Sequence, residues 1–209
     1  MASRIRVIVG LALTLGVGSL PFPVWDHEFV DVAHIIGNEL IYWALVGLTL
    51  LYVTIIERRP LSSIGFRSPT VADCAIGLAA GVVTLAGLWL LYAQVLPMLQ
   101  LSEAEQVNRL KAVPTWLLAT STLRAGVAEE VLFRGYPIER LQEWTHRRSI
   151  AFGVPLICFT LAHVGPWGWA HLLVAGFGGL MLSVLYAWRR NLWVNILAHC
   201  FIDGLAVLA

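Results

Sequence analysis

Apolar residues along this chain form long runs, and most charged residues fall between the runs. The runs lie near 5–24, 34–56, 71–98, 113–133, 149–165, 169–188 and 191–208. A helix that crosses the hydrocarbon core of a bilayer needs about 20 mostly apolar residues. The pattern therefore predicts an all-α membrane protein with about seven transmembrane helices.

The composition agrees with membrane surroundings. Hydrophobic residues make up 58% of the sequence and charged residues 13%, whereas soluble proteins have about 25% charged residues. The net charge of +1 comes without a basic tail, so nothing indicates a nucleic-acid partner. The expected surroundings are a lipid bilayer, and the sequence carries no information on the oligomeric state.

Arginines fall in alternate connections between the runs. They are Arg4, Arg6, Arg58, Arg59, Arg67, Arg140, Arg147, Arg148, Arg189 and Arg190. The other connections hold Asp26, Glu28 and Asp31, a mixed segment 101–111, and the uncharged "VGPWGW". Because Lys and Arg favour cytoplasmic loops, we expect a cytoplasmic N-terminus and an external C-terminus. Without an organelle signal, the expected location is a prokaryotic inner or plasma membrane. The alternative for the first run is a cleaved signal peptide, although no clear A-x-A site follows it.

Two segments between the runs predict surface structure. The segment 134–148 alternates apolar and charged residues, which predicts an amphipathic continuation of the fourth helix at or beyond the cytoplasmic surface. Gly135 and Pro137 are expected to bend it there. The segment 101–111 is expected to be an interfacial helix or a loop.

Ionisable and polar residues nevertheless lie inside three of the runs. They are Glu129, Glu130 and Arg134 in the fourth, His163 in the fifth, and Asn195, His199 and Asp203 in the seventh. A charged side chain in hydrocarbon costs about 3 kcal/mol even on the lenient insertion scales, so such residues are candidates for function. The alternative is a set of structural ion pairs that hold helices together.

Helical spacing separates the roles of these residues. Glu130 and Arg134 are four residues apart and share a helix face, which predicts a supporting ion pair. Glu129 points about 100° away around the helix and must face something else. Asn195, His199 and Asp203 share one face of their helix, which must therefore point into the bundle rather than at lipid.

The three helices can bring one carboxylate and two imidazoles to a similar depth. Glu129 and His163 lie equally far along the chain on either side of His146, where a hairpin is expected. His199 lies roughly 14 Å along its helix from Arg190. We expect the three side chains to converge below the cytoplasmic surface. A carboxylate can take a proton from water, and an imidazole can assist it or stabilise an oxyanion.

These motifs resemble those of a known family. Glu129-Glu130-x-x-x-Arg134, Phe159-x-x-x-His163 and His199-x-x-x-Asp203, in this order on successive helices, are similar to the three motifs of the CPBP (ABI) intramembrane proteases. This is the family of type II CAAX prenyl endopeptidases and bacteriocin-processing proteins. The resemblance predicts N-terminal helices and linkers in 1–110 and a catalytic core in 111–209. It implies a four-helix core enclosing a polar cavity.

The resemblance also implies catalytic roles. Glu129 and His163 would activate water, and His199 and Asp203 would form the oxyanion site. Glu130, Arg134, Phe159 and Asn195 would support them. Many members of the family have Asn where this chain has Asp203, and Asp can donate a hydrogen bond only when it is protonated. Asp203 could instead orient His199 or bind a metal, and Asn195 could supply the missing amide donor.

The implied function is an integral-membrane endopeptidase that acts on a membrane-embedded or lipidated protein or peptide. A glutamate mechanism without a cofactor is favoured. The metal-dependent alternative places a divalent ion such as zinc on Glu129, His163 and His199. Two other classes remain open: a proton-coupled carrier, and a non-enzymatic immunity or scaffold protein. Glu129→Gln distinguishes the three, since it would abolish proteolysis, alter pH-dependent flux, or leave a scaffold unaffected.

Overall fold

The computed structural model describes residues 2–20 and 32–208, and these residues are almost entirely helical, with no strand. Some helices continue into a π-helical segment, marked η below. The elements are α1 (Ala2–Leu11), η1 (Ala12–Val17), α2 (Val32–Leu51), η2 (Tyr52–Ile56), the 3-10 turn η3 (Leu61–Ile64), α3 (Val71–Leu90), η4 (Leu91–Val95), α4 (Leu96–Met98), α5 (Ala104–Lys111), α6 (Thr115–Glu129), η5 (Glu130–Gly135), α7 (Tyr136–Thr145), α8 (Arg148–Ala162), α9 (Val164–Trp167), α10 (His171–Arg189) and α11 (Leu192–Leu208). The predicted all-α fold is confirmed.

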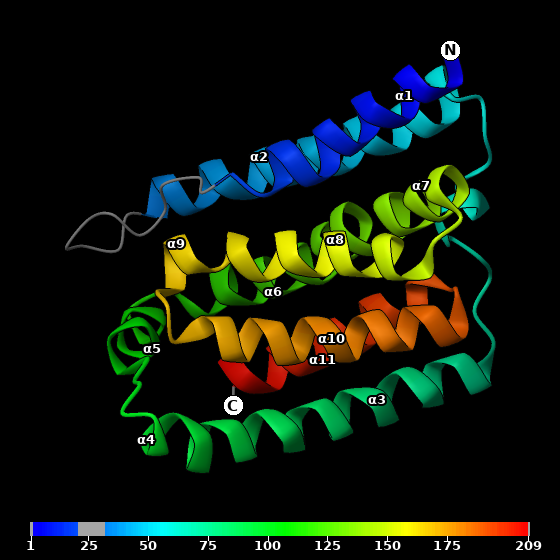
Figure 1. Ribbon diagram of the computed structural model, residues 1–209. Helices are drawn as coiled ribbons and strands as arrows, with labels where there is room; N and C mark the ends of the chain where they lie inside the picture. The colour runs from blue at the N-terminus through cyan, green and yellow to red at the C-terminus, as the bar shows by residue number, and fades with distance from the viewer. Residues whose placement is uncertain (1, 21–31, 209) are drawn as a thin grey trace.

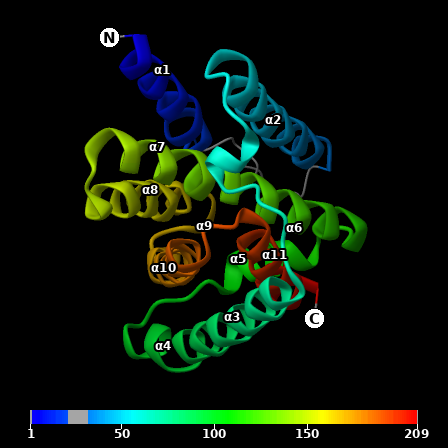
Figure 2. The same cartoon turned by 90° about the vertical axis from the view of Figure 1, so that its right-hand side faces the viewer.

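The long helices run roughly along one common axis (Figure 1). Helices α1 and α2 lie along one side of the bundle and α3 along the opposite side, as both views show (Figure 2). Between them lie α6, α7, α8, α10 and α11, and α11 packs against both α3 and α6. The short helices α5 and α9 lie at one end. The other end, here called the basic end, carries Arg58, Arg59, Arg147, Arg148, Arg189 and Arg190.

Four helical stretches are long and apolar enough to cross a membrane: Val32–Ile56, Val71–Met98, Arg148–Trp167 and His171–Arg189. Helix α11 is apolar but shorter, α1 with η1 is also short, and α6 carries charges. The count of seven therefore stays a prediction. Asp26, Glu28 and Asp31, which carry part of the orientation argument, lie outside the described residues.

Five exposed tryptophans lie near the two ends of the bundle, and two more, Trp43 and Trp89, lie within the long helical stretches that begin with α2 and α3. Trp116 and Trp169 lie near the starts of α6 and α10, whereas Trp144, Trp188 and Trp193 lie at the basic end. Tryptophan is enriched where membrane meets water, because its ring is apolar and its N–H is polar. The two sets are therefore consistent with two interfaces, with the long helices passing between them.

The fourth run continues without a break through α6, η5 and α7, as the sequence predicts. Its surroundings differ from the prediction, however. Glu139 and Arg140 on α7 are buried, because α1 and α8 pack against this helix and the segment before α3 covers it. Arg140 donates to Glu57 Oε2 at 2.7 Å and to Ser63. Residues 134–141 are therefore enclosed by protein, against the prediction, whereas most of 143–148 is exposed at the basic end as predicted.

Glycines allow α11 to approach its neighbours closely. A Cβ atom at Gly77 of α3 would lie 2.9 Å from the backbone oxygen of Val194, and one at Gly126 of α6 would lie 2.3 Å from Cys200 Sγ. Small residues allow such close approach between membrane helices. The close packing places the polar face of α11 directly beside α6 and η5.

Candidate active site

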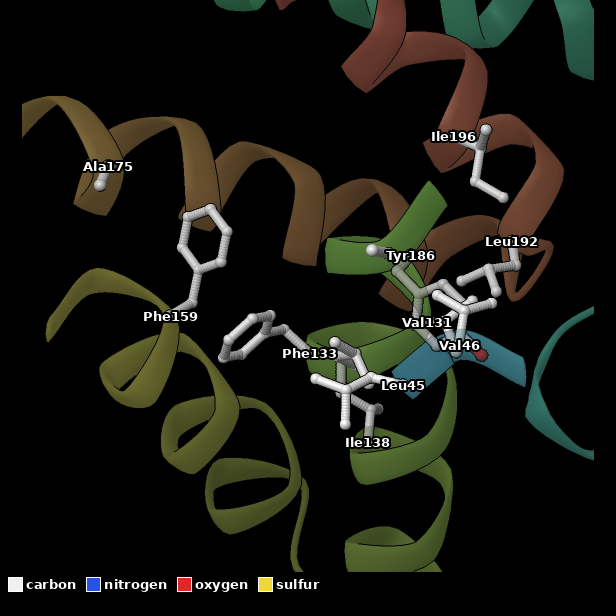
Figure 3. Close-up of a cluster of buried hydrophobic side chains, with 12 residues drawn as sticks. Leu45, Val46, Val131, Phe133, Ile138, Phe159, Ala175, Tyr186, Leu192 and Ile196 are labelled. Atoms are coloured by element: carbon white, nitrogen blue, oxygen red, sulfur yellow. The ribbon is translucent and has the colours of Figure 1, made fainter. Parts of the chain in front are cut away.

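Glu130 and Arg134 form a fully buried ion pair at the centre of the bundle. Arg134 Nη1 lies 2.9 Å from Glu130 Oε1, one helical turn away on η5. The guanidinium lies over the ring of Phe159 on α8, 4.1 Å from its centroid, and Phe133 meets the same ring edge to face (Figure 3). The carboxylate and the aromatic face both offset the cost of burying the cation.

Asn195 supports the same carboxylate from α11. Its Nδ2 donates to Glu130 Oε2 at 3.1 Å and to the backbone oxygen of Leu182 at 2.7 Å. Both amide protons are used, because an NH₂ group carries only two donors. Asn195 therefore cannot supply the missing donor to an oxyanion, as the sequence had suggested as an alternative.

His199 lies between three carboxylates. Its Nδ1 is 2.8 Å from Glu130 Oε1, so this nitrogen donates to the ionised carboxylate. Its Nε2 faces Asp203 Oδ2 at 3.5 Å and Glu129 Oε2 at 3.8 Å. Asp203 is about one third exposed, whereas His199 is buried. Asp203 is thus placed beside the outer nitrogen of His199.

His163 is fixed from its own helix. Its Nδ1 lies 2.7 Å from the backbone oxygen of Phe159, which can only accept, so the proton resides on Nδ1. Its ring packs on the Phe159 ring with centroids 4.4 Å apart. In the neutral imidazole Nε2 then carries a lone pair, and this atom lies 3.8 Å from Glu129 Oε2.

Glu129 is the carboxylate at which these groups converge. Its side chain is 14% exposed, against 0% for Glu130. Its Oε2 faces both Nε2 atoms, and its Oε1 lies 3.8 Å from Nη1 of Arg124 on α6. The two adjacent glutamates thus face different groups, as the helical spacing predicts, and share only His199, which contacts both.

The cluster lies closer to the α5 and α9 end than the sequence predicts. His163 follows the last residue of α8 and stacks on His171, the first residue of α10, with centroids 5.6 Å apart. His171 in turn lies 2.9 Å from Glu103, in the segment before α5. The hairpin count placed Glu129 and His163 at equal depth, but it could not place that depth relative to the two ends.

Among the described residues, no group of three or more His, Cys, Asp and Glu side chains is placed to hold a metal ion. Zinc requires bonds of about 2.0–2.2 Å to nitrogen and oxygen. The Nε2 atoms of both histidines lie 3.8 Å from the same oxygen of Glu129, and the Nε2 of His199 also faces Asp203. Two ligand atoms on one tetrahedral zinc ion lie roughly 3.4 Å apart, which is close to these separations, so metal dependence stays a prediction.

Residues 111–205 match the family model described as type II CAAX prenyl endopeptidase Rce1-like. This part of the chain is an Rce1-like domain. It contains all the motif residues from Glu129 to Asp203. The apolar helices and this domain together make the protein an integral membrane protein.

The chain is also similar to a curated protein, the UPF0177 protein YvdC of Lactococcus lactis subsp. lactis (strain IL1403). The two are 28% identical over 181 residues, which cover 84% of this chain and 65% of the relative. The chain thus spans slightly less than two thirds of that protein's length. No solved structure matches the chain at a significant level.

Two groups of residues around the Glu129 cluster were missed by the sequence reasoning. Arg124 contacts Glu129, and it is paired with Glu39 of α2. His171 stacks on His163 and is hydrogen-bonded to Glu103. Glu39 and Arg124 lie inside apolar runs, and an intramembrane charge was the signal that could have identified them.

Proposed function

We propose that this protein is an integral-membrane endopeptidase in which Glu129 activates water. The observation that carries the proposal is the position of Glu129 Oε2, 3.8 Å from the Nε2 atoms of both His163 and His199. Glu129 Oε2 and His163 Nε2 are acceptors, and a water molecule has two protons to donate to them. A water held in this way directs its oxygen lone pair away from Glu129, towards a substrate carbonyl.

The reaction follows from these positions. The water oxygen attacks the carbonyl carbon, and Glu129 takes one of its protons. The carbonyl oxygen becomes an oxyanion, which His199, protonated on both ring nitrogens, stabilises by donating a hydrogen bond from Nε2. Before the attack, Asp203 orients His199 by accepting from this Nε2, and the oxyanion then takes over that hydrogen bond. Glu129 then returns the proton to the departing amine as the C–N bond breaks.

The remaining motif residues hold the site together. Glu130 fixes Nδ1 of His199, and Arg134 and Asn195 fix Glu130. Phe159 supports both Arg134 and His163. Each side chain that faces the reacting groups is therefore held in place by a neighbouring side chain that does not contact them. This is the arrangement expected of a preorganised site.

The proposed substrate is a membrane-embedded or lipidated protein or peptide, since the site lies within a bundle of lipid-exposed helices. The proposed location is a prokaryotic inner or plasma membrane, which the similarity to a Lactococcus protein supports. The proposed orientation has the basic end in the cytoplasm, because of the arginines it carries.

The test is hydrolysis of a quenched-fluorescent farnesylated peptide that ends in a CAAX box, with purified protein in liposomes. Glu129→Gln is expected to abolish cleavage while the thermal unfolding temperature stays close to that of the wild type. The matched control is Glu105→Gln, on the exposed face of α5, which should cleave at the wild-type rate. Wild-type turnover by Glu129→Gln would show that another group activates water.

A second assay addresses substrates without a prenyl group. Cells that express Glu129→Gln should accumulate uncut membrane proteins that the wild type processes, and terminal-peptide mass spectrometry can identify them. Identical terminal peptides in both strains would contradict the proposed activity.

A further inference from the structure

A second buried cluster of charges adjoins the proposed active site. Glu39 of α2 accepts hydrogen bonds from Ser121 at 2.8 Å and from Arg124 Nε at 3.1 Å, both on α6. The Arg124 guanidinium also lies over the ring of Tyr42, 4.7 Å from its centroid. Glu39 is buried, and the Arg124 side chain is only 17% exposed. Burying two charges inside a membrane bundle is costly, which suggests a functional reason for keeping them.

This cluster reaches Glu129 from the side away from the histidines. Arg124 Nη1 lies 3.8 Å from Glu129 Oε1, whereas Oε2 of the same carboxylate faces His163 and His199. A carboxylate whose two oxygens face different partners has its plane fixed by both of them. Without the guanidinium, only the histidine side would define the orientation of Glu129.

The guanidinium is itself held in place. Arginine has a long side chain with many rotamers, so a lone arginine would position a neighbour poorly. Glu39 binds the Nε edge of Arg124 and Tyr42 covers its face. These two contacts leave the Nη1 edge directed at Glu129. Glu39 and Tyr42 both lie on α2, outside the residues that match the Rce1-like domain.

We infer that Arg124 is a positioning residue for Glu129, and that Glu39 and Tyr42 of α2 hold Arg124 in place. The N-terminal part of the chain thereby contributes to the geometry of the site. The inference rests on the proposed function only in treating Glu129 as the group that activates water. The contact itself can be tested without any substrate.

The first test is a thermal-unfolding cycle in detergent micelles. Arg124→Gln/Glu39→Gln removes the guanidinium without leaving Glu39 unpaired, and provides the background. Glu129→Gln should raise the unfolding temperature in that background, because the variant removes a carboxylate that has lost its cation. In the wild-type background it should lower that temperature or leave it unchanged. Equal shifts in both backgrounds would overturn the inference.

The second test is kinetic and uses the farnesylated CAAX peptide. Arg124→Gln should lower kcat about 10-fold to 100-fold, as misplacement of a reacting group by about 1 Å does. KM should stay within about two-fold, because Arg124 acts through Glu129 and not through the substrate. Arg124→Lys should recover part of kcat, and Arg109→Gln, in an exposed pair on α5, serves as the control.

Glu39→Gln distinguishes positioning from general support of the fold. It should lower kcat in the wild-type background and add nothing in the Arg124→Gln background, since its effect passes through Arg124. Additive losses in kcat, or an unchanged kcat in Arg124→Gln, would overturn the inference. A wild-type protein that leaves the peptide uncut would count against the proposed function alone, since the unfolding cycle still decides whether Arg124 acts on Glu129.

Discussion

Glu129 and Glu130 are neighbours in the sequence and have opposite surroundings. Every polar contact of Glu130 is internal to the bundle: Arg134, Asn195 and His199 surround it and leave it unexposed. Glu129 keeps one oxygen free to face two imidazoles. At the scale of single residues, one carboxylate thus holds neighbouring helices together, and the other is the one that we propose activates water.

Removing Arg134 should destabilise the protein strongly. Arg134→Ala leaves Glu130 as a buried carboxylate without its cation, at a cost of about 3–5 kcal/mol. The variant should therefore express poorly or unfold at a much lower temperature. Glu129→Ala, by contrast, should unfold near the wild-type temperature while losing activity. Equal stability of Arg134→Ala and the wild type, measured by thermal unfolding in one detergent, would contradict the supporting role of the pair.

Asp203 should act on His199 through its charge. Its Oδ2 lies 3.5 Å from His199 Nε2, so we expect an orienting role. Asp203→Asn should then lower kcat about 10-fold at every pH, and a chelator should not change the wild-type rate. The measurement is a pH–rate profile of both proteins, with and without chelator.

Two other results would assign Asp203 differently. If Asp203 donates to the oxyanion, Asp203→Asn should retain the wild-type rate. The fall in activity that the wild type then shows as the pH rises should be absent in this variant. If it belongs to a metal site, activity should disappear in chelator and return with added zinc.

At the scale of elements, the start of α10 is tied to the segment before α5. Glu103 is buried and accepts hydrogen bonds from Tyr92 on η4 and from His171 on α10. Burial by itself would raise the pKa of Glu103, but the hydrogen bonds from His171 and Tyr92 outweigh it and hold the pKa below its ordinary value of 4.5. Because His171 stacks on His163, this contact also supports the proposed active site.

The lowered pKa of Glu103 predicts acid sensitivity. A carboxyl group whose pKa is lower in the folded state stabilises the fold fully above its unfolded pKa, and loses this contribution as the pH falls through the folded pKa. The unfolding temperature of the wild type should therefore fall as the pH drops below about 4.5. Glu103→Gln should start from a lower unfolding temperature at pH 7 and lose less on acidification. Parallel curves for the two proteins would contradict the prediction.

At the scale of the whole molecule, the orientation in the membrane follows from the basic end. Reporters fused after Arg59 and after Arg148 should both read as cytoplasmic, and one fused to the C-terminus should read as external. The measurement compares a reporter active only in the cytoplasm with one active only outside it. A cytoplasmic C-terminus would show that one apolar run does not span, with the first run as the main candidate.

Local geometry made much of the site predictable from sequence. The four-residue spacings of Glu130 with Arg134, and of His199 with Asp203, place these pairs in contact on single helices. The contact of Arg124 with Glu39 could not be derived in this way, because no sequence rule states that α2 packs beside α6. Burial of Arg140 escaped prediction for the same reason, since Glu57 reaches it from a distant segment. Contacts within a helix follow from periodicity, whereas contacts between helices depend on packing.

The π-helical segment η5 changes the rotation of α7 relative to α6 about the axis of the long helix that they form. Within Glu130–Gly135 each backbone bond reaches one residue further than in an α-helix, so the segment holds one residue more than a regular path would need. That residue sets the angle between Glu129, which faces the histidines, and Arg140, which is anchored at the basic end. If the same residues formed a regular α-helix instead, one half of the helix would turn by about 100° relative to the other. The chain could then satisfy the anchor or the active site, but not both.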